Sequence, residues 1–151
     1  MIKNMLKPEY IFFNQTPAST RMEDALKLIG ETCNEYTGIK GSRLAKAFLK
    51  REAMGSTGFG EQLAIPHAKV KGLKEPMIAI FRFTEGIDWN SMDGQPVKIA
   101  VALIMPDGDG DNTHLKVLSK LSRKMVHQEF METLLNTEDP QALYSFMLYD
   151  P

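Results

Sequence analysis

Residues 97–105 read VKIAVALIM, and this run decides the fold because only one of its nine side chains is charged. A strand this continuously apolar is typical of the centre of a sheet that is covered on both faces. A second apolar run, residues 77–83, precedes it, and the connection between the two contains Gly86, Asp93-Gly94 and Pro96. Because these residue types favour turns, we expect two consecutive strands joined by a turn-rich connection.

Helical spacing of apolar residues flanks these strands on both sides. Thr20 and Glu23 have the form of a capping box at the start of one helix, and Asp139 with Pro140 forms a cap and first-turn pair for the last. The other expected elements are strands at 11–13 and 62–65 and helices that start near Met22, Ser42, His114, Gln128 and Ala142. This order predicts a single α/β domain, residues 1–151, with a mixed sheet and helices on both faces.

The composition is that of an ordinary soluble globular chain, with 151 residues, 43% of them hydrophobic and 25% charged. Lys and Arg total 18 against 19 for Asp and Glu, and this net charge of −1 gives no overall basic field for nucleic acid or an anionic membrane. Cys33 is the single cysteine, so no intramolecular disulfide can form. No segment reaches the roughly 20 apolar residues of a membrane span. We therefore expect a cytoplasmic protein that neither inserts into membranes nor binds nucleic acid.

The candidate reactive residue is His67, which lies in the stretch 51–69, REAMGSTGFGEQLAIPHAK. Imidazole is largely neutral, and so nucleophilic, near pH 7 because its unperturbed pKa is about 6.5. Pro66 fixes its own φ and biases Ile65 toward an extended conformation. His67 is therefore expected at the end of a strand.

Two further features of this stretch suit an anion. Arg51 supplies a planar cation, which we expect near the C-terminus of the second helix. Ser56 and Thr57 lie in a glycine-rich turn and offer hydroxyl and backbone N–H groups to an oxyanion. The alternative is a surface salt bridge from Arg51 to Glu52 or Glu61, with the two hydroxyl residues as simple turn residues.

Several motifs occur in one order along most of the chain: Arg51-Glu52, Gly55-Ser56-Thr57-Gly58, Ala64-Ile65-Pro66-His67, Glu85-Gly86-Ile87-Asp88-Trp89 and His114-Leu115. In this order they resemble the fructose/mannitol-type (type 2) enzyme IIA of the bacterial phosphoenolpyruvate:sugar phosphotransferase system. The resemblance implies that the phosphocarrier protein HPr phosphorylates His67. It further implies that His67 passes the phosphoryl group to a sugar-specific enzyme IIB, which serves a membrane enzyme IIC. Arg51 and His114 would surround the phosphorylated ring.

Phosphoryl transfer needs in-line positioning and stabilisation of charge on the phosphoryl oxygens. Arg51 can face these oxygens with two parallel N–H donors. His114 follows Asn112 and Thr113, either of which is a candidate helix cap, so it is expected in a first turn that favours anions. There it would donate a hydrogen bond to the phosphoryl group or orient His67. The sequence leaves open which ring nitrogen of His67 attacks.

An apolar collar around His67 is expected, because a partner must dock flat to bring its own reactive residue in line. The candidates near His67 in the sequence are Phe59, Leu63, Ile65, Ala68 and Val70. Such encounters are usually small and transient.

A second class of function uses the same histidine. In this alternative the chain resembles the nitrogen-regulatory enzyme IIA, whose phosphorylation state changes its binding to a partner protein. A phosphoryl group adds roughly one and a half to two negative charges, enough to switch a partner.

No metal ion or other cofactor is expected. Asp107, Asp109 and Asp111 imitate the first ligands of an EF-hand loop, but Asn112 and Leu118 stand where that loop needs glycine and glutamate. His67 and His114 have no third zinc ligand at the usual spacing.

Overall fold

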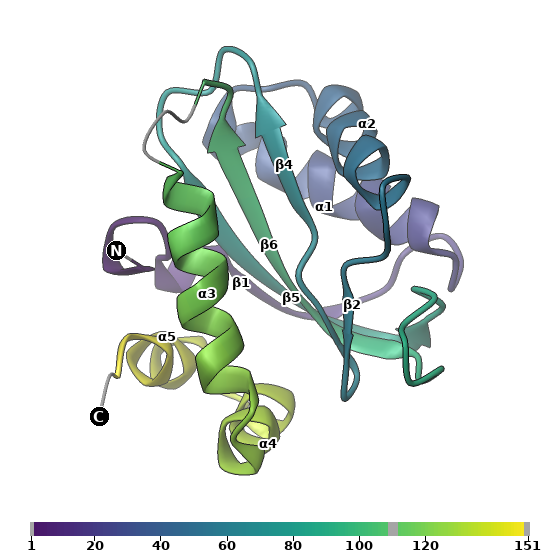
Figure 1. Cartoon of the computed structure of the whole chain (residues 1–151), viewed down its shortest axis with the longest axis vertical. Coiled ribbons are helices and arrows are strands. Elements are labelled where there is room, and N and C mark those ends of the chain that lie inside the picture. The colour runs from purple at the N-terminus through teal and green to yellow at the C-terminus, as the bar shows by residue number, and fades with distance from the viewer. Residues whose placement is uncertain (1, 109–111, 150–151) are drawn as a thin grey trace.

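The apolar run at residues 97–105 lies in strand β6, Val97–Pro106, at the centre of a mixed sheet. The computed structural model describes residues 2–108 and 112–149, and within them the sheet has six strands (Figure 1). β6 pairs antiparallel with β5, Met77–Ile87, and parallel with β3, Leu63–Ala64, and β4, His67–Val70. At the outer edges β1, Ile11–Gln15, is parallel to β5, and β2, Gly58–Gly60, is antiparallel to β3.

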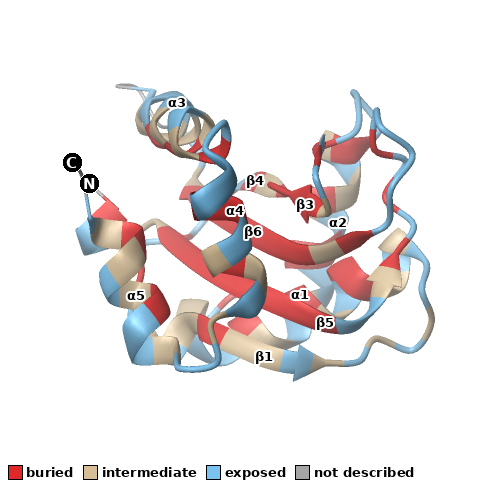
Figure 2. Ribbon diagram, turned by 90° about the horizontal axis from the view of Figure 1, so that it is seen from below, coloured by how far each residue is buried: buried red, intermediate tan, exposed pale blue. Residues whose placement is uncertain are grey.

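Helices cover both faces of this sheet (Figure 2). One face carries α1, Met22–Thr37, and α2, Gly41–Glu52. The other carries α3, Thr113–Met125, α4, Gln128–Asn136, and α5, Pro140–Leu148. Two short 3-10 turns, Ile2–Asn4 and Pro8–Tyr10, precede β1. The predicted mixed sheet with helices on both faces is confirmed.

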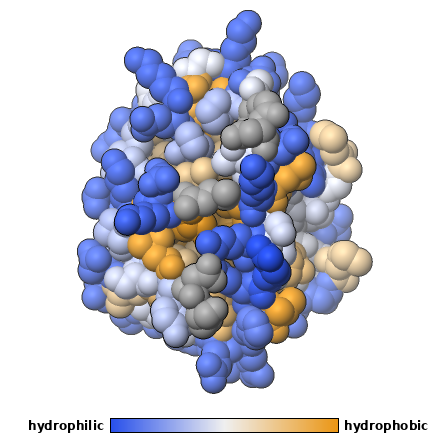
Figure 3. Space-filling view, turned by 60° about the vertical axis from the view of Figure 1, so that its left-hand side comes forward, coloured by the Kyte–Doolittle hydropathy of each residue, from blue (hydrophilic) through white to orange (hydrophobic). Residues whose placement is uncertain are grey.

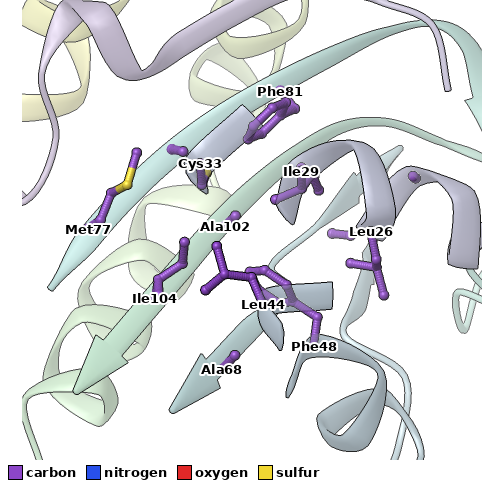
Figure 4. Packing of buried hydrophobic residues seen from close by; sticks show 14 of the residues in the cluster. Leu26, Ile29, Cys33, Leu44, Phe48, Ala68, Met77, Phe81, Ala102 and Ile104 are labelled. Atoms are coloured by element: carbon purple, nitrogen blue, oxygen red, sulfur yellow. The ribbon is translucent and has the colours of Figure 1, made fainter. Parts of the chain in front are cut away.

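The side chains of β6 contribute alternately to two separate cores, because successive side chains of a strand point to opposite faces. Ala100, Ala102 and Ile104 belong to the core under α1 and α2. Ile99, Val101 and Leu103 belong to the core under α3, α4 and α5. Figure 4 shows the first core, in which Ala102 and Ile104 of β6 and Ala68 of β4 face side chains of α1 and α2. Burial on both faces is therefore why β6 carries almost no polar residues.

The segment that contains His67 departs from the prediction. We expected a strand that ends at His67, but β3 stops at Ala64 and β4 starts at His67, with both aligned in one continuous register along β6. Pro66 lies at the break because it has no N–H to donate, while its carbonyl accepts from Leu103 N. His67 thus begins an edge strand that lies against α2 on one side.

Of the two predicted helix caps, the structure contains the one on α5 and lacks the one on α1. The Thr20–Glu23 capping box is absent, since α1 begins after Arg21, which makes no side-chain cap, and Ser19 Oγ accepts from Arg21 N instead. Asp139 does cap α5, because its carboxylate accepts from Gln141 N at 3.1 Å. This second prediction is confirmed.

The surface is mainly hydrophilic on the side shown in Figure 3, with separate hydrophobic patches between charged side chains. Across residues 2–108 and 112–149, no helix combines the length and the apolar character that a membrane span requires.

Close contact between α1 and α2 leaves no room at Gly30. A Cβ there would lie 2.4 Å from the carbonyl oxygen of Gly41, which is backbone and cannot swing away. We predict that Gly30→Ala lowers the free energy of unfolding by about 1–3 kcal/mol, because this clash outweighs the better helix propensity of alanine. Urea denaturation measures the change, with the exposed α2 substitution Lys46→Ala as a control expected to stay close to wild type. Equal stability of both variants would contradict a tight α1–α2 contact.

Candidate active site

A groove of about 650 Å³ opens between α2, β4 and the start of α3. Its lining residues are Ala47, Lys50, Arg51, Met54, His67, Ala68, Lys69, Met105, Asp107, His114, Leu115 and Leu118. The structure thus brings together His67, Arg51 and His114, which are far apart in the sequence. Arg51 lies in the last turn of α2 and His114 in the first turn of α3, as their positions in the sequence predicted.

The two ring nitrogens of His67 have different partners. Arg51 Nε donates to His67 Nε2 at 3.0 Å, and His67 Nδ1 lies 3.0 Å from the carbonyl oxygen of Ile65. A guanidinium N–H can only donate and a carbonyl can only accept. Nε2 must therefore carry the lone pair and Nδ1 the proton, which makes the ring neutral.

The surroundings also favour this neutral ring. Burial lowers the pKa of His67 below its ordinary value of 6.5, and the positive charge of Arg51 and the nearby His114 lower it further. The hydrogen bond to the Ile65 carbonyl and the carboxylate of Glu52 oppose this shift without cancelling it. At neutral pH the ring consequently keeps its lone pair.

We predict that an NMR titration of His67 gives a pKa below 6.5. The sign of the linked stability change follows, because the unfolded chain takes up the proton more readily than the folded one. The free energy of unfolding should fall as the pH is lowered from about 6.5 toward the folded pKa. His67→Gln should remove this part of the pH dependence. A titration midpoint above 6.5 would contradict the burial and charge argument.

Arg51 does not form the surface salt bridge that was its alternative. Its Nη1 donates to the carbonyl oxygen of Gly55 at 2.7 Å, while its Nε holds His67. The side chain is thereby fixed at two points.

The hydroxyls of Ser56 and Thr57 were predicted to bind phosphate, and the structure uses both for internal bonds. Ser56 Oγ donates to the carbonyl oxygen of Trp89 at 2.9 Å. Thr57 is buried, and its hydroxyl donates to a carboxylate oxygen of Glu52. The side-chain prediction is therefore wrong for both residues, because their hydrogens are committed to holding the turn.

Glu52 and Trp89 were missed as members of this region. Glu52 is buried, accepts from Thr57 N at 2.9 Å, and also accepts from Trp89 Nε1 at 3.2 Å. From the sequence, Trp89 was named only as part of a motif, yet its indole also reaches Thr57 Oγ1 at 3.3 Å. The one signal in the sequence was Glu52, because a glutamate that becomes buried at the end of a helix needs hydrogen-bond donors around its carboxylate.

The predicted docking collar is largely wrong. Leu63 and Ile65 are buried in the core under α3, and Val70 with Ala68 in the core under α1 and α2, although Ala68 also reaches the groove. Leu63, Ile65 and Val70 therefore cannot present a surface to a partner. Phe59 is 39% exposed but does not line the groove. The exposed apolar side chains of the groove are instead Met54 and Leu115, which are 80% and 54% exposed.

The groove offers no metal site among the described residues, where His, Cys, Asp and Glu never come together in threes as ligands would. Of the EF-hand-like residues, Asp107 lies at the groove, while Asp109 and Asp111 are outside the described part of the chain.

The chain is similar to known proteins along most of its length. The model of a family described as "Phosphoenolpyruvate-dependent sugar phosphotransferase system, EIIA 2" matches residues 4–149. The chain belongs to this EIIA family. The match confirms the resemblance inferred from the ordered motifs.

Similar proteins include fructose-specific components and nitrogen regulatory proteins. The chain is 41% identical over 98 residues to the fructose-specific EIIABC component of Bacillus subtilis, which aligns with 65% of this chain but only 15% of that protein. It is 39% identical over 97 residues to the fructose-specific EIIA component of Haloferax volcanii, covering 64% of this chain and 62% of that one. It is also 34% identical over 129 residues to a nitrogen regulatory protein of Bradyrhizobium diazoefficiens, covering 85% and 84%. The chain therefore spans less than two thirds of the fructose-specific relatives.

Solved EIIA structures share the fold of this chain. The nitrogen regulatory protein IIA-Ntr from Neisseria meningitidis superimposes with a TM-score of 0.88 at 25% identity, covering 97% of this chain and 98% of that one. The enzyme IIAMTL in complex with phosphorylated enzyme IIBMTL from Escherichia coli superimposes with a TM-score of 0.74 at 18% identity, covering 94% and 99%.

Proposed function

We propose that this chain is a phosphocarrier of a sugar phosphotransferase system, which accepts a phosphoryl group from phospho-HPr on His67 and passes it to an enzyme IIB. Membership of the EIIA family supports a role in phosphotransfer. The observation that carries the proposal is the neutral His67 ring, which lines an open groove and whose Nε2 lone pair accepts from Arg51 in the same groove.

In the proposed reaction His67 Nε2 is the nucleophile. The bond between phosphorus and the HPr histidine breaks as the bond from Nε2 to phosphorus forms, and the HPr nitrogen keeps the electron pair. The His67 ring becomes more positive in this step, and the hydrogen bond from Nδ1–H to the Ile65 carbonyl stabilises that charge. The reverse sequence of events delivers the phosphoryl group to enzyme IIB.

Arg51 and His114 are proposed to stabilise the phosphoryl oxygens. When Nε2 attacks, the Nε–H of Arg51 must leave it and turn toward the incoming oxygens. Donors that lie beside the reacting nitrogen can then act where charge lies in the transition state. His114 lines the same groove from the first turn of α3, where backbone N–H groups also favour an anion.

The experiment that tests this function is incubation with phosphoenolpyruvate, enzyme I and HPr, followed by intact-mass analysis. We expect one acid-labile phosphate per chain, which a fructose-type or mannitol-type enzyme IIB then removes. A folded protein that acquires no phosphate would overturn the proposal.

A regulatory function is the second candidate, because the nitrogen regulatory relative aligns along most of both chains and IIA-Ntr superimposes at a TM-score of 0.88. It would use the same phosphorylation step. Phosphate that is accepted from HPr but never leaves for any enzyme IIB tested would favour this candidate.

The exposed apolar rim of the groove is the proposed docking surface. We predict that Leu115→Ser raises the concentration of phospho-HPr needed for half-maximal transfer about 5-fold to 30-fold, as expected for the loss of about 1–2 kcal/mol of apolar contact. Stability should hardly change, because the side chain is 54% exposed. Phe59→Ala is the matched comparison. A larger effect of Phe59→Ala than of Leu115→Ser would move the docking surface to β2, which contains Phe59 of the predicted collar.

A further inference from the structure

Glu52 has an unusual position for a carboxylate, because it is only 9% exposed and lies next to Arg51 at the end of α2. Burying a charge is costly unless it is well hydrogen-bonded. Here Oε1 accepts from Thr57 N at 2.9 Å and from Trp89 Nε1 at 3.2 Å, and Oε2 accepts from the Thr57 hydroxyl. The proposed reaction uses Arg51, His67 and His114 but gives this carboxylate no part.

One chain of contacts leads from Glu52 to His67 Nδ1. Thr57 is held because its N–H and its hydroxyl both donate to the Glu52 carboxylate. The carbonyl oxygen of Thr57 accepts from Ile65 N at 3.0 Å. The carbonyl oxygen of Ile65 in turn accepts from His67 Nδ1 at 3.0 Å. The acceptor that determines the tautomer of the ring is therefore held through Thr57.

A second chain of contacts leads to His67 Nε2. The same bonds to Thr57 close the turn at residues 53–57, which is also tied by Gly55 N donating to the Glu52 carbonyl oxygen at 3.0 Å. Gly55 presents its own carbonyl oxygen to Arg51 Nη1 at 2.7 Å, and Arg51 Nε reaches Nε2 at 3.0 Å. The donor on the reactive nitrogen is therefore held through the same turn.

We propose that Glu52 is a positioning residue that holds both hydrogen-bond partners of the His67 ring through its bonds to Thr57. It touches neither the ring nor the incoming phosphoryl group. Trp89 strengthens the arrangement, because its indole donates to Glu52 and its carbonyl oxygen accepts from Ser56 within the same turn. The proposal rests on the proposed function for its kinetic consequence only.

The substitution that tests it is Glu52→Gln, which keeps the shape of the side chain but replaces one acceptor oxygen with an NH₂ group. The amide can keep its oxygen toward Thr57 N and Trp89 Nε1 only by turning its NH₂ toward the Thr57 hydroxyl, which must then accept where it had donated, and the hydrogen bonds to a charged carboxylate are lost. Because displacement of the reacting groups by about 1 Å can cost 10²-fold in rate, we expect the maximal rate of transfer from phospho-HPr to fall about 10-fold to 100-fold. The concentration of HPr at half-maximal rate should stay near the wild-type value.

Two matched variants separate positioning from bulk or charge. Thr57→Ser keeps the hydroxyl and the N–H that bond Glu52 and should behave like wild type, whereas Thr57→Val removes only the hydroxyl and should lose rate in the same direction as Glu52→Gln. Glu31→Gln, on the exposed surface of α1, removes a carboxylate elsewhere and should change nothing. Thr57→Val carries the test by itself if Glu52→Gln does not fold.

The second readout needs no phosphoryl transfer. Long-range ¹H–¹⁵N NMR of the histidine rings reports the tautomer of His67 in the unphosphorylated protein. Wild type is expected to show the Nδ1–H form, and Glu52→Gln a mixture in which the Nε2–H form is clearly populated. A purely structural role of Glu52 would lower stability but leave the tautomer of the folded protein unchanged.

The outcomes distinguish this proposal from the proposed function. Wild-type protein that accepts no phosphate but loses its single tautomer on Glu52→Gln would defeat the function and keep the positioning role. A folded Glu52→Gln protein with the wild-type tautomer and the wild-type maximal rate would overturn the positioning role and leave the function intact.

Discussion

Replacement of His67 by glutamine is expected to abolish phosphate uptake, with the rate from phospho-HPr falling below a thousandth of wild type. Glutamine approximates the size of the ring and can still accept from Arg51 Nε, but its amide has no nucleophilic lone pair comparable to that of Nε2. Covalent catalysis is lost entirely when the nucleophile is removed, so this is the largest effect expected for any substitution in the groove. Intact-mass analysis after incubation with phosphoenolpyruvate, enzyme I and HPr measures it.

Two other histidines serve as controls for this loss. His127 is exposed and does not line the groove, so His127→Gln should accept phosphate at the wild-type rate. His114 lines the groove, and His114→Gln should still accept phosphate, more slowly than wild type. Phosphate that persists on the His67→Gln protein but disappears from a His67→Gln, His114→Gln double variant would transfer the role of nucleophile to His114.

The sequence predicted the sheet and its helices well where the pattern was continuous. β6 was identified as the central strand because burial on both faces removes nearly every polar residue from it. The segment around His67 was harder, because β3 and β4 are short and are divided at Pro66. They are strands because they pair with β6, which begins 30 residues after His67. Such distant pairing produces no pattern in the local sequence.

The same limit explains the errors at the site. Leu63 and Ile65 were expected at the surface because they are near His67 in the sequence, but strand alternation turns them into the core under α3. The exposed apolar residues of the groove come from other elements, Met54 from the turn after α2 and Leu115 from α3. Nearness to a reactive residue along the chain is therefore a poor guide to its docking surface.

The tautomer of His67 needed three-dimensional information of a specific kind. One partner, Ile65, is only two residues away, but its carbonyl faces the ring only because Thr57 and the break at Pro66 place it there. The other partner, Arg51, is 16 residues away. The sequence indicated Arg51 as suitable for phosphoryl transfer and Ile65 only as a docking residue, and it could not say which nitrogen either would hold.

Replacement of Arg51 by lysine is expected to slow transfer from phospho-HPr by about 10²-fold to 10³-fold, the range seen when one preorganised donor is lost. Arginine holds Gly55 through Nη1 and Nε2 of His67 through Nε, and still keeps further N–H groups in one plane for phosphoryl oxygens. A lysine ammonium keeps the positive charge that helps to lower the pKa of His67, so the ring stays neutral and the loss must come from geometry. Single-turnover transfer measures the rate.

The neighbouring cation provides the control, since Lys50→Gln removes a full charge from the same groove and should slow transfer only about 2-fold to 3-fold through weaker steering of the partner. If Arg51→Lys and Lys50→Gln slowed transfer equally, the groove would act through its overall charge, and the planar fork of Arg51 would have no special part in the reaction.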